Sequence, residues 1–137
     1  MTQEEKKLLI KDLCARLPYG VIVNINGTYN NVLESVNWYY EVEVGIVSTE
    51  VYTISDVKPY LFPLSSMTDK DLIEFLQING MNLNSDELKI FRRVQTTIVS
   101  TLSSYSRNID WLNAHHFDYR GLIEKGLAID ATGLNIY

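Results

Sequence analysis

The hydrophobic pattern of the chain changes its period near residue 20. Leu9, Leu13 and Leu17 recur every four positions, which is typical of the buried face of a helix. From residue 21 the period becomes two, as in a strand with one buried face. Asn26-Gly27 then supplies two residues that tolerate positive φ, as a tight hairpin turn requires. A helical start followed by short antiparallel strands predicts an α+β fold.

Local signals divide the rest of the chain. Thr2 and Glu5 have the spacing of a capping box, which predicts the start of a first helix. The strand pattern ends before two prolines, which bar regular pairing and predict a packed connector. We therefore expect an N-terminal helix, a four-stranded antiparallel sheet or small open barrel, and C-terminal helices, in one domain over residues 1–137. The predicted segments are a helix at 3–16, a strand region at 20–54 with its clearest strand at 38–47, a connector at 55–67, a helical region at 68–126 and a tail at 127–137.

The helical region contains one ambiguous segment. Helices are expected over about 69–78, 108–116 and 119–125. Between about 86 and 105, apolar residues at spacings of three and four, Val94 among them, predict a helix. The β-branched run Thr96, Thr97, Ile98 and Val99 favours a strand instead. We adopt the helix, and the strand is the alternative.

Charge and cysteine content narrow the classes of function. The formal net charge of −5 argues against broad binding to nucleic-acid phosphates, because such binding needs a basic surface. Cys14 is the only cysteine, which excludes an internal disulfide and a cysteine-rich zinc site, and we expect it to be buried. The sequence lacks the apolar run of about 18 residues that a membrane helix needs, and its opening residues do not form a signal peptide. We therefore expect a cytoplasmic protein.

The stretch HHFDYRG, residues 115–121, contains the side chains best suited to chemistry. Two imidazoles and a carboxylate are suitable ligands for zinc or iron. Adjacent His115 and His116 would point about 100° apart on a helix, so regular geometry does not let both bind one ion. The chain has no third histidine. A metal site formed by His115, His116 and Asp118 is therefore kept as an alternative.

A structural role accounts for the same residues. Asp118 is suited to cap the helix expected at 119–125, and histidines near the end of the preceding helix interact favourably with its negative terminus. Arg120 is expected to pair with Asp118 or with an acidic strand residue. We adopt this interpretation and assign no catalytic residue, metal or cofactor.

Aromatic residues of the strand region suggest a second kind of site. Exposed rings on a sheet stack single-stranded bases or bind a peptide, whereas alternate rings of a strand belong to its core. Tyr39 is opposite in phase to Tyr40 and is the ring expected outside. Tyr39, Trp38 and Tyr29 are the candidate binding residues.

Three blocks of sequence resemble one protein family. They are KDLCARLPYGV near the start, KPYLFPLSSMT in the middle and DWLNAHHFDYRGLIEKGLAIDATGLNIY at the end. These blocks are similar to a family of small uncharacterised proteins of gut Bacteroides-type bacteria and their phages. The resemblance spans the chain and implies a bacterial or phage cytoplasmic setting, but it implies no activity, cofactor or site residue.

The leading hypothesis for function is a non-enzymatic protein-binding or accessory module of bacterial or phage origin. It rests on the absence of a phosphate-binding glycine loop and of a nucleophile motif from the sequence. We expect a protein partner rather than nucleic acid or a membrane, with a homodimer through an edge strand as one assembly. Two alternatives stay open: a small metal-dependent hydrolase using His115, His116 and Asp118, and a single-strand nucleic-acid binder using the strand aromatics.

Overall fold

The structure, a computed structural model, describes residues 1–37, 41–44 and 51–137. The chain packs as two compact units, each with a hydrophobic core of its own. Unit 1 comprises residues 1–61 and 120–137, and unit 2 comprises residues 62–119. A single domain over the whole chain stays a prediction, because a division by packing does not say whether either unit folds alone.

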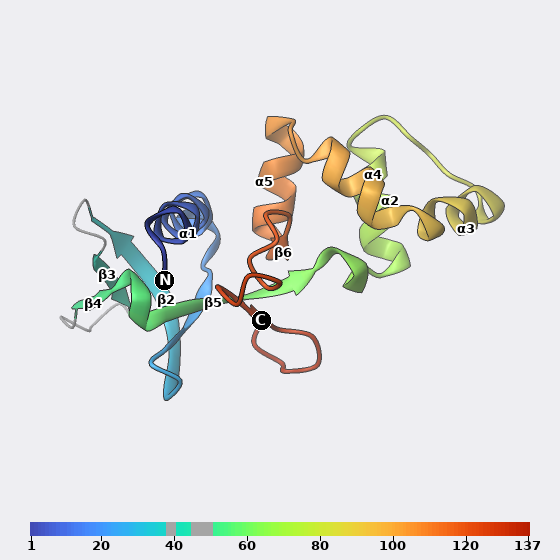
Figure 1. The fold of residues 1–137 in the computed structure, drawn as a ribbon. Helices are drawn as coiled ribbons and strands as arrows, with labels where there is room; N and C mark the ends of the chain where they lie inside the picture. Colours follow the sequence, from blue (N-terminus) through green and yellow to red (C-terminus); the bar gives the residue numbers. More distant parts are fainter. Residues whose placement is uncertain (38–40, 45–50) are drawn as a thin grey trace. The chain divides into compact units, whose positions relative to one another are not determined.

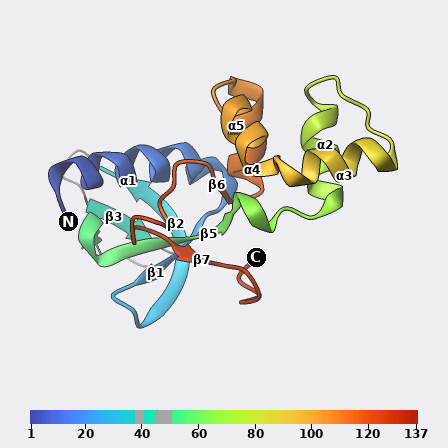
Figure 2. The ribbon, with the colours of Figure 1, turned by 45° about the vertical axis from the view of Figure 1, so that its right-hand side comes forward.

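Unit 1 begins with helix α1 (Gln3–Arg16), which has the predicted bounds. The Thr2 hydroxyl accepts a hydrogen bond from the Glu5 amide (3.1 Å), and the Glu5 carboxylate accepts one from the Thr2 amide (2.7 Å). The predicted capping box is therefore present. Leu9 and Leu13 are fully buried in the core of unit 1, where α1 lies across one face of the strands (Figures 1 and 2).

The first four strands of unit 1 form an antiparallel meander, and β5 pairs antiparallel with β1, which gives the spatial order β4-β3-β2-β1-β5. Val42 is fully buried in the described part of the strand predicted at 38–47, whereas residues 38–40 and 45–47 lie outside the described residues. The α+β class is confirmed, and among the described residues there are more strands than the four predicted. The strands are β1 (Ile22–Ile25), β2 (Tyr29–Val36), β3 (Glu41–Val44), β4 (Val51–Thr53), β5 (Val57–Pro63) and β7 (Ile129–Asp130), which pairs parallel to β5.

The turn between β1 and β2 lies where the sequence predicts it. Asn26 and Gly27 have φ of 51° and 72°, the positive values that this dipeptide tolerates. Ile25 pairs with Tyr29, so the loop contains three residues.

The irregular connector predicted at 55–67 is wrong in its centre, which is strand β5. The Asn26 amide donates to the Asp56 carbonyl (2.8 Å), so these two residues form a hydrogen-bonded pair. In an antiparallel ladder every second pair of opposite residues is hydrogen-bonded, and the pairs between them are not. Pro59 lies opposite Val23, at a position where the ladder to β1 needs no amide hydrogen. A proline is therefore compatible with this strand.

Unit 2 consists of helices and one short strand. Its core contains Phe75, Val99 and Trp111 among other buried side chains. The elements are α2 (Asp69–Gln77), α3 (Ser85–Arg93), α4 (Gln95–Leu102), α5 (Ser106–Ala114) and β6 (Phe117–Asp118), which pairs parallel to the end of β5. None of the helices in the described residues has the length and apolar character needed to span a bilayer.

The helical region differs from the sequence predictions in two places. The segment from 86 to 105 is helical rather than a strand, but it is broken at Val94, where φ is −120° and ψ is 17°. The helix predicted at 119–125 is wrong, because those residues form turns. Gly121 has a φ of 72°, which a right-handed helix does not accommodate.

Candidate functional site

Residues 115–119 form an aromatic corner of unit 2. The ring of His115 stacks on that of Trp111, with centroids 4.0 Å apart and planes at 22°. Phe117 stacks on the same indole at 5.7 Å, and Phe62 of β5 lies 6.1 Å from Phe117. Trp111 is only 9% exposed. The corner is thus held by a row of rings from α5, β5 and β6.

The stack and one hydrogen bond orient the His115 ring. Nδ1 lies 2.8 Å from the carbonyl oxygen of Trp111, one turn earlier in α5. A carbonyl oxygen only accepts, so Nδ1 carries a proton and donates to it. Nε2 lies 3.7 Å from Glu74 Oε1, beyond hydrogen-bond distance, and that oxygen accepts from the Trp111 indole (3.2 Å). His115 therefore interacts with the end of its helix as the sequence predicts.

The other candidate ligands have different surroundings. His116 has a φ of 61°, and its carbonyl accepts from the Phe62 amide (2.8 Å). Asp118 is buried in β6, so its predicted role as a helix cap is wrong. Within the described part of the chain, no three histidine, cysteine, aspartate or glutamate side chains gather in a way that could hold a metal ion. The structure therefore does not assemble His115, His116 and Asp118 into a ligand set.

Arg120 belongs to unit 1 and pairs with a residue that the sequence did not suggest. Its Nη1 lies 2.8 Å from Asp12 Oδ1. Asp12 Oδ2 in turn accepts from Arg16 Nε at 2.8 Å, and the side chains of Asp12 and Arg16 are fully buried. Asp12 thus joins α1 to the chain that returns from unit 2.

A hollow of about 290 Å³ opens beside His115 in unit 2. The Ser66 hydroxyl donates to the Pro63 carbonyl (2.7 Å), so its proton is directed away from His115 and the two do not form a nucleophile and base pair. The Asp71 carboxylate accepts from the Thr68 amide (3.0 Å), which leaves its second oxygen for other donors. The hollow is lined by Phe62, Ser66, Thr68, Asp71, His115 and Phe117.

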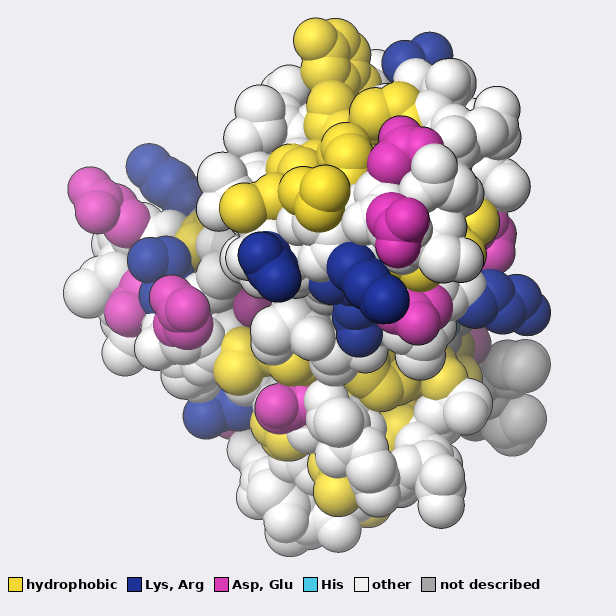
Figure 3. All heavy atoms as spheres, turned by 90° about the vertical axis from the view of Figure 1, so that its right-hand side faces the viewer, with side chains coloured by type: hydrophobic (Ala, Val, Ile, Leu, Met, Phe, Trp, Pro, Cys, Tyr) yellow, Lys and Arg dark blue, Asp and Glu magenta, His cyan; other side chains and the backbone are white. Residues whose placement is uncertain are grey.

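Helix α3 presents a face that the sequence analysis did not single out. None of its residues is buried, although Leu88 and Phe91 pack partly against the core of unit 2. Ile90 is 62% exposed and Val94, just after the helix, is 47% exposed. Figure 3 shows hydrophobic side chains gathered in a band on the side where α3 lies, with Lys and Arg side chains along its border. The sequence does contain a signal for the exposure of Ile90, because this residue lies two positions after Leu88 and therefore points away from the packed stripe of the helix.

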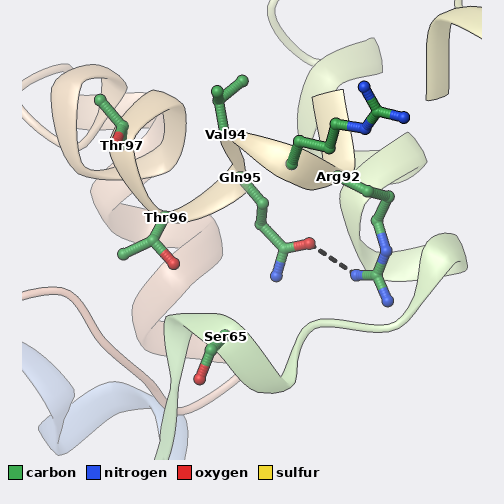
Figure 4. Close-up of a pocket in the computed structure, with 7 residues that line it drawn as sticks. Ser65, Arg92, Val94, Gln95, Thr96 and Thr97 are labelled. Carbon is green, nitrogen blue, oxygen red and sulfur yellow. Dashed lines mark hydrogen bonds between the residues drawn. The ribbon is translucent and has the colours of Figure 1, made fainter. Parts of the chain in front are cut away.

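The break between α3 and α4 is held by a buried glutamine. Gln95 is 6% exposed, and its amide nitrogen donates to the Leu64 carbonyl at 2.7 Å. Arg92 Nη1 donates to Gln95 Oε1 at 2.6 Å, and Figure 4 shows the two side chains pointing toward one another. Arg92 also donates to the Met67 carbonyl and pairs with Asp69 at 3.1 Å. Arg92 therefore fastens the end of α3 to the segment before α2.

A second hollow of about 290 Å³ lies at this break. It is polar, and Ser65, Thr96 and Thr97 are labelled on its walls in Figure 4. Because Arg92 makes the internal contacts described above, its guanidinium is a structural part of this hollow.

Of the three aromatic candidates, only Tyr29 is described. Tyr29 is 42% exposed, its hydroxyl is hydrogen-bonded to that of Tyr52, and the two rings meet edge to face at 6.4 Å. Trp38 and Tyr39 lie outside the described residues. The strand platform therefore stays a prediction.

Cys14 is exposed, so the expectation of a buried cysteine is wrong. Partial burial of the thiol raises its pKa. A nucleophilic cysteine needs the opposite shift, because the thiolate is the reactive form.

Comparison with known families, curated proteins and solved structures finds no match to this chain.

Proposed function

We propose that this chain is a non-enzymatic protein-binding module of bacterial or phage origin, and that it binds through the exposed face of α3. The observation that carries the proposal is that α3 buries none of its residues while Ile90 and the adjoining Val94 remain exposed. Single exposed apolar residues are ordinary, but neighbouring ones four positions apart form a patch. The resemblance to small proteins of Bacteroides-type bacteria and their phages supports the proposed origin.

A cap at its N-terminus helps to stabilise α3, which has no buried residue. The Asn84 side chain accepts from the Glu87 amide at 2.9 Å, and the Glu87 carboxylate accepts from the Asn84 amide at 3.4 Å. An isolated helix of nine residues is marginal in water, so its packed side and its cap must both contribute to its stability. The free side of α3 is thus a formed helical surface rather than a frayed segment.

The occupant that matches this surface is a second copy of the chain. Asp86, Ile90 and Arg93 are four and three residues apart, so they share one face, and all three are exposed. Asp86 and Arg93 are separated by roughly 10 Å along the helix axis, with Ile90 between them. An antiparallel pair of α3 helices related by a two-fold axis near Ile90 would place each Arg93 beside the partner's acidic end. The charges of this face are therefore complementary to those of a second copy.

Sedimentation equilibrium over about 1 to 500 µM protein tests this assembly, a range suited to a small interface. We expect the wild-type protein to dimerise reversibly within that range and Ile90→Asp to remain a monomer. Leu134→Asp is the matched control, because Leu134 is 50% exposed and lies in unit 1. A wild-type monomer throughout, or equal effects of the two substitutions, would refute the self-pairing of α3.

Charge reversal gives an independent check. Asp86→Lys and Arg93→Glu should each weaken the dimer, because each places like charges together across the two-fold axis. The double variant restores opposite charges and should dimerise again. If the double variant stays a monomer although its thermal midpoint equals that of the wild-type protein, the antiparallel pairing is contradicted.

A further inference from the structure

We propose that the hollow beside His115 is a binding site for an organic cation, an ammonium group carried on an apolar stem. The hollow is separate from the α3 face and lies within unit 2. Its volume of about 290 Å³ suits the end of a side chain or a small amine.

The walls of the hollow suit the stem and the charge of such a ligand. Phe62 and Phe117, whose rings are tilted by 55°, supply apolar and aromatic surface. A ring face attracts a cation through its quadrupole, in addition to covering the methylene groups next to it.

The polar groups of the hollow mostly accept hydrogen bonds. Asp71 supplies a carboxylate whose Oδ2 already accepts from an amide, so Oδ1 has room for a further donor. The Ser66 hydroxyl donates to a carbonyl within its own turn and has lone pairs left. The hollow thus offers a carboxylate oxygen and a hydroxyl oxygen to the donors of an ammonium group.

The charged side chains around the hollow also favour a cation over an anion. Glu74 lies 3.7 Å from His115 Nε2, which places a second carboxylate beside the hollow. The nearby guanidinium of Arg92 is paired with Asp69 and bonded to Gln95. An anion would therefore meet carboxylates, whereas a cation would gain charge-assisted hydrogen bonds.

Nuclear magnetic resonance titration of the ¹⁵N-labelled protein with benzylamine tests the proposal. We expect saturable shifts at the amides of Asp71, His115 and Phe117 and at the indole of Trp111, which stacks on His115. Benzyl alcohol and benzoate have the same ring without the positive charge, and both should bind at least about tenfold more weakly. Binding of benzyl alcohol as tight as that of benzylamine, or no saturable shifts at all, would overturn the proposal.

Asp71→Asn removes the charge but keeps an oxygen that can accept from the Thr68 amide, so the cap of α2 is preserved. This variant should lose about tenfold in affinity for benzylamine. Glu87→Gln is the matched control, because Glu87 has the same capping-box position in α3 and does not line the hollow. Equal losses in the two variants would refute a role for Asp71.

The source of the cation is distinguished by a second titration with Nα-acetyl-lysine amide. Tighter binding of benzylamine indicates a free aromatic amine, and tighter binding of the lysine derivative indicates a lysine side chain of a peptide. Both results support the cation site. The sedimentation experiment reports on α3 alone, so failure of one proposal is distinguishable from failure of the other.

Discussion

Replacing Asp12 with alanine tests the ion pairs that join α1 to the returning chain in unit 1. Asp12 lies 2.8 Å from Arg16 through one carboxylate oxygen and 2.8 Å from Arg120 through the other. The side chains of Asp12 and Arg16 are fully buried, and that of Arg120 is 15% exposed. The Asp12 carboxylate therefore pairs with two guanidinium groups in a region with little solvent.

The expected magnitude follows from the burial of Arg16. Removing one partner of a buried ion pair costs about 3–5 kcal/mol, because the remaining charge is left in the interior without its counter-charge. We expect Asp12→Ala to lower the free energy of unfolding by about 4 kcal/mol, a large share of the roughly 5–15 kcal/mol of a typical domain. Urea denaturation followed by far-ultraviolet circular dichroism measures this difference, and an unchanged slope would locate the effect in the native state.

Asp69→Ala provides the contrast. Asp69 pairs with Arg92 at 3.1 Å, but its side chain is 67% exposed. Exposed pairs contribute about 1 kcal/mol or less, so this variant should unfold at nearly the wild-type urea concentration. If Asp12→Ala costs no more than Asp69→Ala, burial of the pair does not determine its contribution, and the reasoning is wrong.

The remaining predictions concern three single residues. Tyr137→Phe removes a hydroxyl that accepts from the Ile22 amide (3.0 Å) and donates to the Tyr60 carbonyl (2.8 Å), so it should cost about 1–2 kcal/mol in urea titrations. Burial raises the pKa of Tyr137 from 10.0 to about 12, so the wild-type protein should lose stability as the pH rises through that window, and parallel curves for Tyr137→Phe would contradict this. The raised pKa of the Cys14 thiol predicts slower reaction with a disulfide reagent near neutral pH in the native protein than after unfolding, and equal rates would exclude the effect. His116→Val should cost about 1–2 kcal/mol more than His116→Asn in the same urea assay, because a β-branched residue is disfavoured at a φ of 61° and asparagine tolerates it; equal costs would count against backbone strain.

Local signals were sufficient for the helix starts and the first turn. The capping box at Thr2 is contained in four residues, so the sequence alone predicts where α1 begins, and the box that the structure shows at Thr68 is equally local. The turn at Asn26-Gly27 is similarly local, because both residues must adopt positive φ.

Features that depend on distant residues were not predictable in this way. The ladder between β5 and β1 decides whether Pro59 is tolerated, and the partner residue is Val23, far away in the sequence. Arg120 pairs with Asp12 across 108 positions, and no local spacing connects the two. The aromatic corner also joins Phe62 to Phe117 through the pairing of β5 with β6.

The choice between Val94 and Gln95 shows why the α3 face was missed. Apolar spacing suggested Val94 as part of the packed stripe, yet Val94 is 47% exposed and Gln95 is 6% exposed. A buried amide costs little when its hydrogen bonds are made, and Gln95 bonds to the Leu64 carbonyl and to Arg92. With Gln95 inward, the next buried residue is Val99, one turn further, and the break leaves Val94 beside exposed Ile90. The polar partners of one glutamine, which the hydrophobic pattern does not record, thus determine which apolar residues remain exposed.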